Sequence, residues 1–138
     1  MMEIAPKVER KVAMLDESKS VLDAASVMVE RYIGSVVVVG GGDVKGIFTE
    51  RDLMRVIAQR QDPAATRLQS VMRADIVSVH PEASIEQCLE LMRRNRCRHL
   101  LVYEAERCIG IISLRDLAAL MLEEKENLVR DLTRYITG

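Results

Sequence analysis

The chain has 138 residues, of which 49% are hydrophobic and 30% are charged, and its formal net charge is −1. This length accommodates one globular domain, or two small units that share a core, so a separate catalytic domain is not expected. The 20 Lys and Arg residues are balanced by 21 Asp and Glu residues. The chain therefore has no broad field of one sign, which argues against general binding of nucleic acid or of an acidic membrane surface.

No segment has the pattern of a membrane span or of an export signal. The longest purely aliphatic run, from Val36 to Val39, is far shorter than the roughly 20 residues that cross a bilayer. The first ten residues have no apolar stretch of the kind found in signal peptides. We therefore expect a cytoplasmic protein that has no contact with a membrane.

The cysteines argue against a metal site. Cys88, Cys97 and Cys108 form no C-x-x-C pair, and neither histidine is spaced to complete a zinc site. We expect reduced thiols that pack as small apolar groups, and the pattern leaves open a disulfide within or between chains.

The sequence contains an internal repeat. Gly46 and Ile47 align with Gly110 and Ile111, an offset of 110 − 46 = 64 residues, and no gap is needed. The same offset aligns the segment Arg51-Asp52-Leu53 with Arg115-Asp116-Leu117. Such a repeat predicts two copies of one structural unit.

Each copy has the same predicted order of elements. Short strands at 12–15 and 76–79 are followed by helices that begin at Ser20 and Ser84, where Asp23 and Gln87 complete capping boxes. Two strands and a turn follow in each copy, at 35–39 and 44–48 and again at 99–103 and 108–112. A second helix then ends each copy, so the predicted unit is β-α-β-β-α.

The predicted fold is mixed α/β (α+β). One unit of about 60 residues buries too little apolar surface to be stable alone, so we expect the two units to pack sheet to sheet with pseudo-twofold symmetry. Clefts between such units are suited to small ligands. We place unit 1 at 8–60, a linker at 61–71, unit 2 at 72–122 and a C-terminal amphipathic helix at 123–138.

The residues from Gly46 to Asp52, and their copy from Gly110 to Asp116, carry the strongest chemical signal. Both read Gly, two apolar residues, a hydroxyl residue, two further residues and Asp. The hydroxyl and the Asp fit a capping box that starts a helix. A helix N-terminus also attracts phosphate, and a carboxylate one turn along can accept the hydroxyls of a ribose. The motif therefore suggests nucleotide binding without catalysis.

Two copies of this motif, each at the end of a β-α-β-β-α unit, resemble a tandem pair of cystathionine β-synthase (CBS) domains, known as a Bateman module. The resemblance covers about residues 8–122 and includes the segments Asp23-Ala24-Ala25 and Val71-Met72. It implies a sensor of an adenosine ligand such as AMP, ADP, ATP or S-adenosylmethionine, which acts as a regulatory ligand and not as a cofactor.

The resemblance also assigns roles to residues. It implies that Thr49 and Ser113 meet phosphate and that Asp52 and Asp116 meet ribose. It implies an apolar slot for the base, formed by the first strand and by the residues before the middle strand: Val12, Ala13, Met14, Gly34 and Ser35 in one copy, and Ile76, Val77, Ser78, Arg98 and His99 in the other.

The two predicted sites are unequal because Arg98-His99 replaces Gly34-Ser35, and similar domains that bind phosphorylated adenosines often have basic residues at this position. For His99 an ordinary structural role is the alternative. Arg51 and Arg115 are also candidates for phosphate contacts, although surface ion pairs with neighbouring acids are an equal alternative.

Three hypotheses follow for the function. The first is a non-catalytic regulator that binds an adenosine ligand and signals to another protein through a change of shape or of dimer packing. The second is a dimerisation or interaction module in which the motif only caps helices. The third, which has the least support, is a redox response through Cys97 or Cys108. No set of nucleophile, base and orienting group can be assembled, and in the first two cases we expect a homodimer.

Overall fold

The computed structural model describes residues 3–137 and divides the chain into two compact units. The first unit is Lys11–Ile76. The second unit combines the chain from Val77 onward with the N-terminal segment up to Arg10. The predicted boundaries at 8–60, 61–71 and 72–122 follow the repeat. In the structure, the segment that precedes each repeat belongs instead to the unit of the other repeat.

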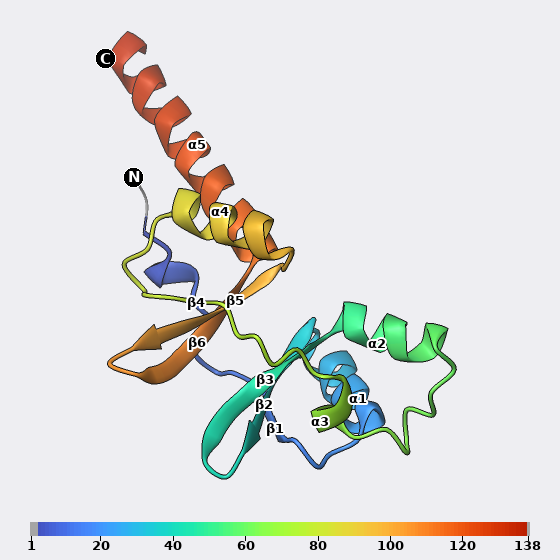
Figure 1. The fold of residues 1–138 in the computed structure, drawn as a ribbon. Helices are drawn as coiled ribbons and strands as arrows, with labels where there is room; N and C mark the ends of the chain where they lie inside the picture. Colours follow the sequence, from blue (N-terminus) through green and yellow to red (C-terminus); the bar gives the residue numbers. More distant parts are fainter. Residues whose placement is uncertain (1–2, 138) are drawn as a thin grey trace. The chain divides into compact units, whose positions relative to one another are not determined.

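The first unit contains a three-stranded sheet in the order β1-β2-β3. Strand β1 is parallel to β2, and β2 is antiparallel to β3. Helix α1 contacts α2 and β2, and α2 contacts β3 (Figure 1). The elements are β1 (Met14–Asp16), α1 (Val21–Arg31), β2 (Ser35–Gly40), β3 (Asp43–Thr49), α2 (Glu50–Ala58) and α3 (Leu68–Val71).

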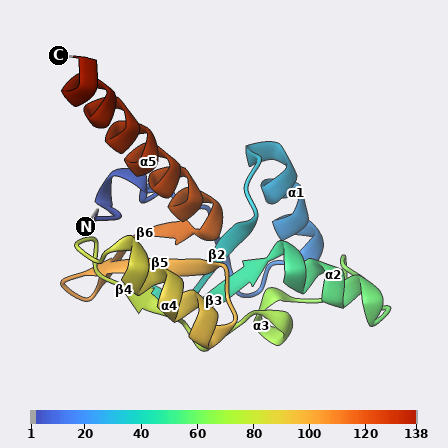
Figure 2. The same cartoon turned by 90° about the horizontal axis from the view of Figure 1, so that it is seen from above.

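The second unit repeats this arrangement with the sheet order β4-β5-β6. Helix α4 contacts α5 and β5, and α5 also contacts β6 and the short 3-10 helix η1 (Figure 2). The elements are η1 (Ala5–Lys7), β4 (Ser78–Val79), α4 (Ile85–Asn95), β5 (His99–Glu104), β6 (Arg107–Ser113) and α5 (Leu114–Thr137). The predicted β-α-β-β-α order is confirmed in both copies.

Matching local signals start and end the first helix of each unit. Ser20 and Ser84 accept the backbone N–H of Asp23 and Gln87 at 3.0 and 3.1 Å, and the reciprocal side-chain bonds complete the predicted capping boxes. Tyr32 ends α1 in the left-handed conformation, and Arg96, 64 residues later, ends α4 in the same way. The repeat therefore preserves backbone geometry where the side chains differ.

The predicted hairpins are present in both units. Gly41 and Gly42 supply positive φ angles of 58° and 85° at the first turn, which glycine adopts without steric cost. Ala105 and Glu106 adopt positive φ angles at the second turn, with no glycine. Both hairpins have a register shift at equivalent points, between Val38 and Val39 in the first and between Val102 and Tyr103 in the second.

Each unit has its own apolar core. In the first unit Phe48 is fully buried, and Leu68 from the predicted linker packs in the same cluster. In the second unit the core includes Ile4 from the N-terminal segment, together with Leu117 and Leu120 from α5. The segment predicted as a linker is therefore part of the first unit's fold, and residues before the repeat help to fold the second.

The exchanged segments occupy equivalent places. Glu9 forms an isolated antiparallel bridge with Ile111 of β6, and its counterpart Arg73 forms the same bridge with Ile47 of β3. The N–H···O distances are 2.9 and 3.1 Å in the second unit and 3.0 and 2.8 Å in the first. Each hairpin thus gains a single β-bridge from a segment that precedes the opposite repeat.

Helix α5 differs from the prediction. The sequence pattern separates a helix of unit 2 from a C-terminal helix at 123–138, but α5 runs without interruption from Leu114 to Thr137. No Gly or Pro occurs between these residues, so nothing in the chain ends the helix after its first turns. Residue 138 lies outside the described part of the chain.

Candidate functional site

In the first unit, Thr49 and Asp52 bond to each other at the N-terminus of α2. The Oδ2 atom of Asp52 accepts the Thr49 backbone N–H at 2.9 Å and the Thr49 hydroxyl at 3.0 Å. In return, the Thr49 Oγ1 atom accepts the Asp52 backbone N–H at 3.3 Å. Asp52 is only 8% exposed. The predicted capping role of this hydroxyl and this carboxylate is confirmed.

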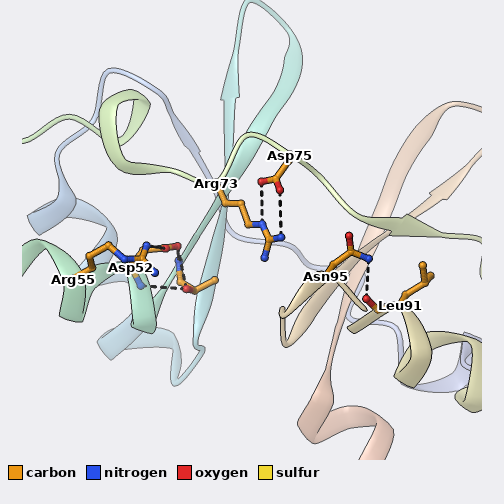
Figure 3. A network of polar contacts seen from close by, with 7 residues as sticks. Asp52, Arg55, Arg73, Asp75, Leu91 and Asn95 are labelled. Atoms are coloured by element: carbon orange, nitrogen blue, oxygen red, sulfur yellow. Dashed lines mark hydrogen bonds and ion pairs between the residues drawn. The ribbon is translucent and has the colours of Figure 1, made fainter. Parts of the chain in front are cut away.

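The second oxygen of Asp52 has a partner that the sequence prediction missed. Its Oδ1 atom accepts a hydrogen bond from Arg55 at 3.0 Å, and the two side chains form an ion pair along α2 (Figure 3). The spacing of three residues on one helix is the signal that could have indicated this pair. Asp52 is thus held in one orientation from both sides.

In the second unit, Ser113 and Asp116 form the same box at the start of α5. Asp116 Oδ2 accepts the Ser113 backbone N–H at 2.8 Å and its hydroxyl at 2.9 Å, and Ser113 Oγ accepts the Asp116 N–H at 3.1 Å. The residue equivalent to Arg55 is Ala119, so Oδ1 of Asp116 lacks the partner that Asp52 has. Asp116 is also less deeply buried than Asp52.

A lysine from the exchanged N-terminal segment lies near Asp116. The Lys7 ammonium group forms an ion pair with Glu123 at 2.8 Å. This hydrogen bond and the charge of Glu123 raise the pKa of Lys7, and the charge of Asp116 adds to the same effect. Because Lys7 is distant from α5 in sequence, spacing within the motif could not have indicated it.

The residues before each middle strand lie next to the motif of the same unit. The Glu50 N–H donates to the carbonyl of Gly34 at 3.0 Å, and the Leu114 N–H donates to the carbonyl of Arg98 at 2.8 Å. Ser35 is the register partner of Thr49, as His99 is of Ser113. The structure therefore brings together, within each unit, the predicted hydroxyl, carboxylate and pre-strand residues.

The first-strand candidates lie further from the motif. Met14 is the register partner of Val37, two residues along β2 from Ser35, and Ser78 is the register partner of Leu101. Both Met14 and Ser78 are exposed, whereas Val12, Ile76 and Val77 are half-buried and Ala13 is buried. In each sheet the middle strand separates these residues from the strand that carries the motif, and no backbone hydrogen bond of the described chain joins them to it.

Arg51 and Arg115 have exposed side chains. Neither forms an ion pair with another residue of the described chain. The surface ion pairs considered for them are therefore not present among residues 3–137.

The two sites differ in the residue that covers the pre-strand position. A Cβ atom placed on Gly34 would lie 2.6 Å from Oε1 of Glu50, so the Glu50 side chain lies over this glycine. At the equivalent positions the second unit has Arg98 and Leu114. The first unit thus has an acidic group over a position that is occupied by an arginine in the second unit.

Close packing explains why the motif begins with glycine in both units. A Cβ atom on Gly46 would lie 2.5 Å from the carbonyl oxygen of Arg73, and one on Gly110 would lie 2.7 Å from that of Glu9. These are the segments that form the added bridges on β3 and β6. The motif glycines therefore allow close approach of another backbone.

A cavity of about 250 Å³ lies in the first unit beside Asp52. Its walls come from α2 and from the segment around α3, and they are mainly polar. It is lined by Asp52, Arg55, Val56, Gln59, Gln61, Ser70, Val71 and Met72.

The cysteines give no sign of a reactive thiol. All three are free, and Cys88 is buried. Burial raises the pKa of Cys88 to about 11 and also raises the pKa of Cys108, so both disfavour the reactive thiolate form. Among residues 3–137 no group of His, Cys, Asp and Glu could hold a metal ion. In the same part of the chain, no helix combines the length and the apolar character needed to cross a membrane.

Comparison with known proteins identifies relatives that share both units. The chain is 32% identical over 119 residues to the CBS domain-containing protein YhcV of Bacillus subtilis, covering 86% of this chain and 84% of that protein. A CBS-domain protein from Burkholderia ambifaria has a similar structure, with 37% identity, a TM-score of 0.80 and coverage of 83% of this chain and 85% of the other. The protein ATU1752 from Agrobacterium tumefaciens has 30% identity, a TM-score of 0.82 and coverage of 87% and 99%.

Two further solved structures bear on ligands and on assembly. The CBS domain protein PAE2072 from Pyrobaculum aerophilum, complexed with AMP, has a TM-score of 0.77 and 24% identity over 88% of this chain and 97% of its own, and so shares the fold. A hexameric CBS-CP12 protein from bloom-forming cyanobacteria has a TM-score of 0.79 and 26% identity, and the match covers 98% of this chain and 82% of that one.

The family model for the CBS domain matches residues 3–59 and 68–123. Each match includes one of the two motif boxes, which are Thr49 with Asp52 in the first match and Ser113 with Asp116 in the second. The first match also begins within the N-terminal segment that the structure assigns to the second unit. The chain therefore belongs to the CBS domain family and contains two CBS domains.

Proposed function

We propose that this chain is a non-catalytic regulatory protein that binds an adenosine ligand, such as AMP, ADP, ATP or S-adenosylmethionine, at its hydroxyl and carboxylate boxes. The observation that carries the proposal is the repeated geometry of Thr49 with Asp52 and of Ser113 with Asp116, each at a helix N-terminus. The AMP complex of PAE2072, a protein of the same fold, is consistent with it.

The hydrogen-bonding capacity of the box suits the two ends of a nucleotide. A carboxylate has about four lone-pair sites, and Asp116 uses two of them on Ser113. The remaining oxygen can accept ribose hydroxyls, while the serine hydroxyl and the helix N-terminus can approach phosphate. Asp52 uses a third site on Arg55, so a ribose at the first box has to compete with that arginine.

The charges next to the boxes support unequal ligands. Arg98 directly precedes His99, the register partner of Ser113, so the second box has a cation beside it for phosphate, whereas Lys7 is held in its ion pair with Glu123. Glu50 lies over Gly34 beside the first box, where it repels phosphate. We propose that the second box takes the phosphorylated ligand and that the first box favours an adenosine compound without an anionic group at this position.

Isothermal titration calorimetry with AMP, ADP, ATP and S-adenosylmethionine tests the proposal. Replacing Asp116 by Ala removes a charged acceptor, which costs about 2–3 kcal/mol or roughly 30-fold to 100-fold in affinity. Asp75→Ala is the matched control, because Asp75 is an exposed carboxylate that is also hydrogen-bonded, in its case to Arg73. Circular dichroism of the unliganded variants distinguishes a lost contact from a lost fold.

Two results would overturn the binding proposal. One is the absence of binding heat for all four ligands with the unaltered chain. The other is equal affinity of the unaltered chain, the Asp52→Ala variant and the Asp116→Ala variant.

A second candidate function rests on a different observation. Several large apolar side chains on the helices are exposed, among them Val29, Met54 and Tyr135 at 75%, 69% and 88%. Such surfaces mark interaction sites, and the cyanobacterial relative is hexameric. We propose that the chain self-associates, which would hold whether or not a nucleotide binds. Light scattering that returns the 15.6 kDa mass of one chain at all concentrations would contradict this.

A further inference from the structure

Helix α5 continues well beyond the core of its unit. Leu117 and Leu120 are fully buried, but every residue from Glu124 to Ile136 is exposed. Figure 1 shows this C-terminal part of α5 extending away from the sheet of the second unit. Most of the helix therefore receives no support from the core of its unit, although an isolated helix of this length is only marginally stable in water.

The exposed part of α5 carries one continuous apolar face. Its side chains recur at the spacing that places them on one side of a helix. Tyr135 and Ile136 are 88% and 81% exposed, and the others are about half exposed. We call this surface the α5 face, and it consists of Met121, Leu122, Leu128, Val129, Leu132, Tyr135 and Ile136, with Lys125 in its middle.

We propose that a second copy of this chain covers the α5 face by pairing its own α5 in the antiparallel direction. This inference rests on the proposed self-association and names its interface. Two helices that cross in opposite directions at Leu128 and Val129 place Met121 against Ile136 and Leu122 against Tyr135. A contact about a twofold axis must be self-complementary in this way, and the face overlaps with itself along its whole length.

Lys125 supplies the charge complementarity that selects the direction. In the antiparallel pair, Lys125 lies against Leu132 of the second copy and next to Asp131 of that copy, so its stem packs on the apolar face while its ammonium group reaches a carboxylate. Within one helix, residues 125 and 131 are six apart and do not lie on the same side. A parallel pair would instead place the two Lys125 side chains against each other.

A single charged residue within an apolar helix face is a known means of fixing the register and direction of helix pairs. The overlap from Met121 to Ile136 is sixteen residues, which corresponds to about 24 Å of helix. This is a short contact, so we expect a dimer that dissociates on dilution.

Sedimentation velocity of the full chain over a range of concentrations tests the interface. The unaltered chain is expected at twice the 15.6 kDa mass of one chain at high concentration. Leu128→Glu should shift the dissociation constant at least about tenfold towards monomer. Ile57→Glu is the matched control, because Ile57 on α2 is 57% exposed and Leu128 is 59% exposed, and this change should leave the α5 pair intact.

A charge exchange tests the direction. Lys125→Glu should weaken the dimer because it faces Asp131, and the double change Lys125→Glu with Asp131→Lys should restore the dissociation constant to within about threefold. In a parallel pair residue 125 does not face residue 131 of the second copy, so adding Asp131→Lys would not restore the dimer. Failure of this rescue would overturn the antiparallel arrangement.

The remaining outcomes separate the two proposals. A dimer that resists Leu128→Glu would refute the α5 face as the interface while self-association still holds. A chain that is monomeric at every concentration would refute both. Circular dichroism should show that Leu128→Glu leaves the two units folded, since Leu128 lies outside the apolar core.

Discussion

Gly34 and Glu50 in the first unit stand at the positions of Arg98 and Leu114 in the second. The two pairs share backbone geometry, because each glycine or arginine carbonyl accepts the first N–H of the following helix. They differ in charge at a helix N-terminus, where the dipole by itself would favour an anion in both units. At these positions the difference between the sites therefore lies in the side chains and not in the backbone.

Replacing Glu50 by Leu should raise the affinity of the first box for AMP. The change removes a negative charge near the expected phosphate, an effect of about 1 kcal/mol or roughly fivefold in affinity. The change is made in the Asp116→Ala variant, in which the second box is weakened, so that calorimetry measures binding at the first box. Glu30→Leu is the control, because Glu30 is an exposed acid on α1 of the same unit. An AMP affinity that is the same with and without the Glu50→Leu change would show that this carboxylate does not set ligand choice.

At the scale of single elements, capping boxes start most of the helices that position the site. In helices α1, α2 and α4 the N-cap hydroxyl accepts the backbone N–H of the residue three positions on, and the side chain of that residue accepts the N-cap backbone N–H. The bonds of Ser113 with Asp116 do the same for α5. The boxes of α2 and α5 coincide with the proposed ligand contacts, so a deletion there removes a helix cap together with a ligand contact. The boxes of α1 and α4 lie away from the motif, so changes there test the capping role alone.

Ser84→Ala should therefore lower the free energy of unfolding by about 1 kcal/mol, the usual effect of losing a helix N-cap. Ser84 is 7% exposed, so the loss of its bond to the Gln87 N–H is not fully compensated by water. Ser26→Ala is the control, because Ser26 lies within α1 and bonds only to a carbonyl of the preceding turn. Chemical unfolding followed by circular dichroism measures both, and equal midpoints for the two variants would contradict the capping role.

Local patterns predicted these elements correctly because their causes are local. The boxes at Ser20 and Ser84, the alternating strands and the glycine turn are each contained within a few residues. The exchange of Glu9 and Arg73 between repeats was missed because a single bridge leaves no periodic signal. The full extent of α5 was missed because its face turns from the core towards solvent after Leu120 while the helix continues.

The exchange of leading segments links the two units of the whole molecule through the chain. The N-terminal segment adds a bridge at Ile111, an ion pair from Lys7 to Glu123 and the fully buried Ile4 to the second unit. The stability of that unit therefore depends on residues that precede the first repeat. Lys7 also links this segment to Asp116, because the charge of Asp116 adds to the effect of Glu123 in raising the pKa of Lys7.

Ile4→Ala should consequently destabilise the second unit, although the rest of that unit begins only at Val77. Large-to-small changes at fully buried aliphatic positions cost about 2–5 kcal/mol, because a cavity is left in the core. Ile57→Ala is the control, because its side chain is 57% exposed. Hydrogen exchange read by mass spectrometry should show faster exchange in β5 and β6, which belong to the same core, with less change in β2 and β3. Loss of protection confined to the first unit would contradict the exchanged arrangement, because Ile4 would then have to support the core that follows it directly in the chain.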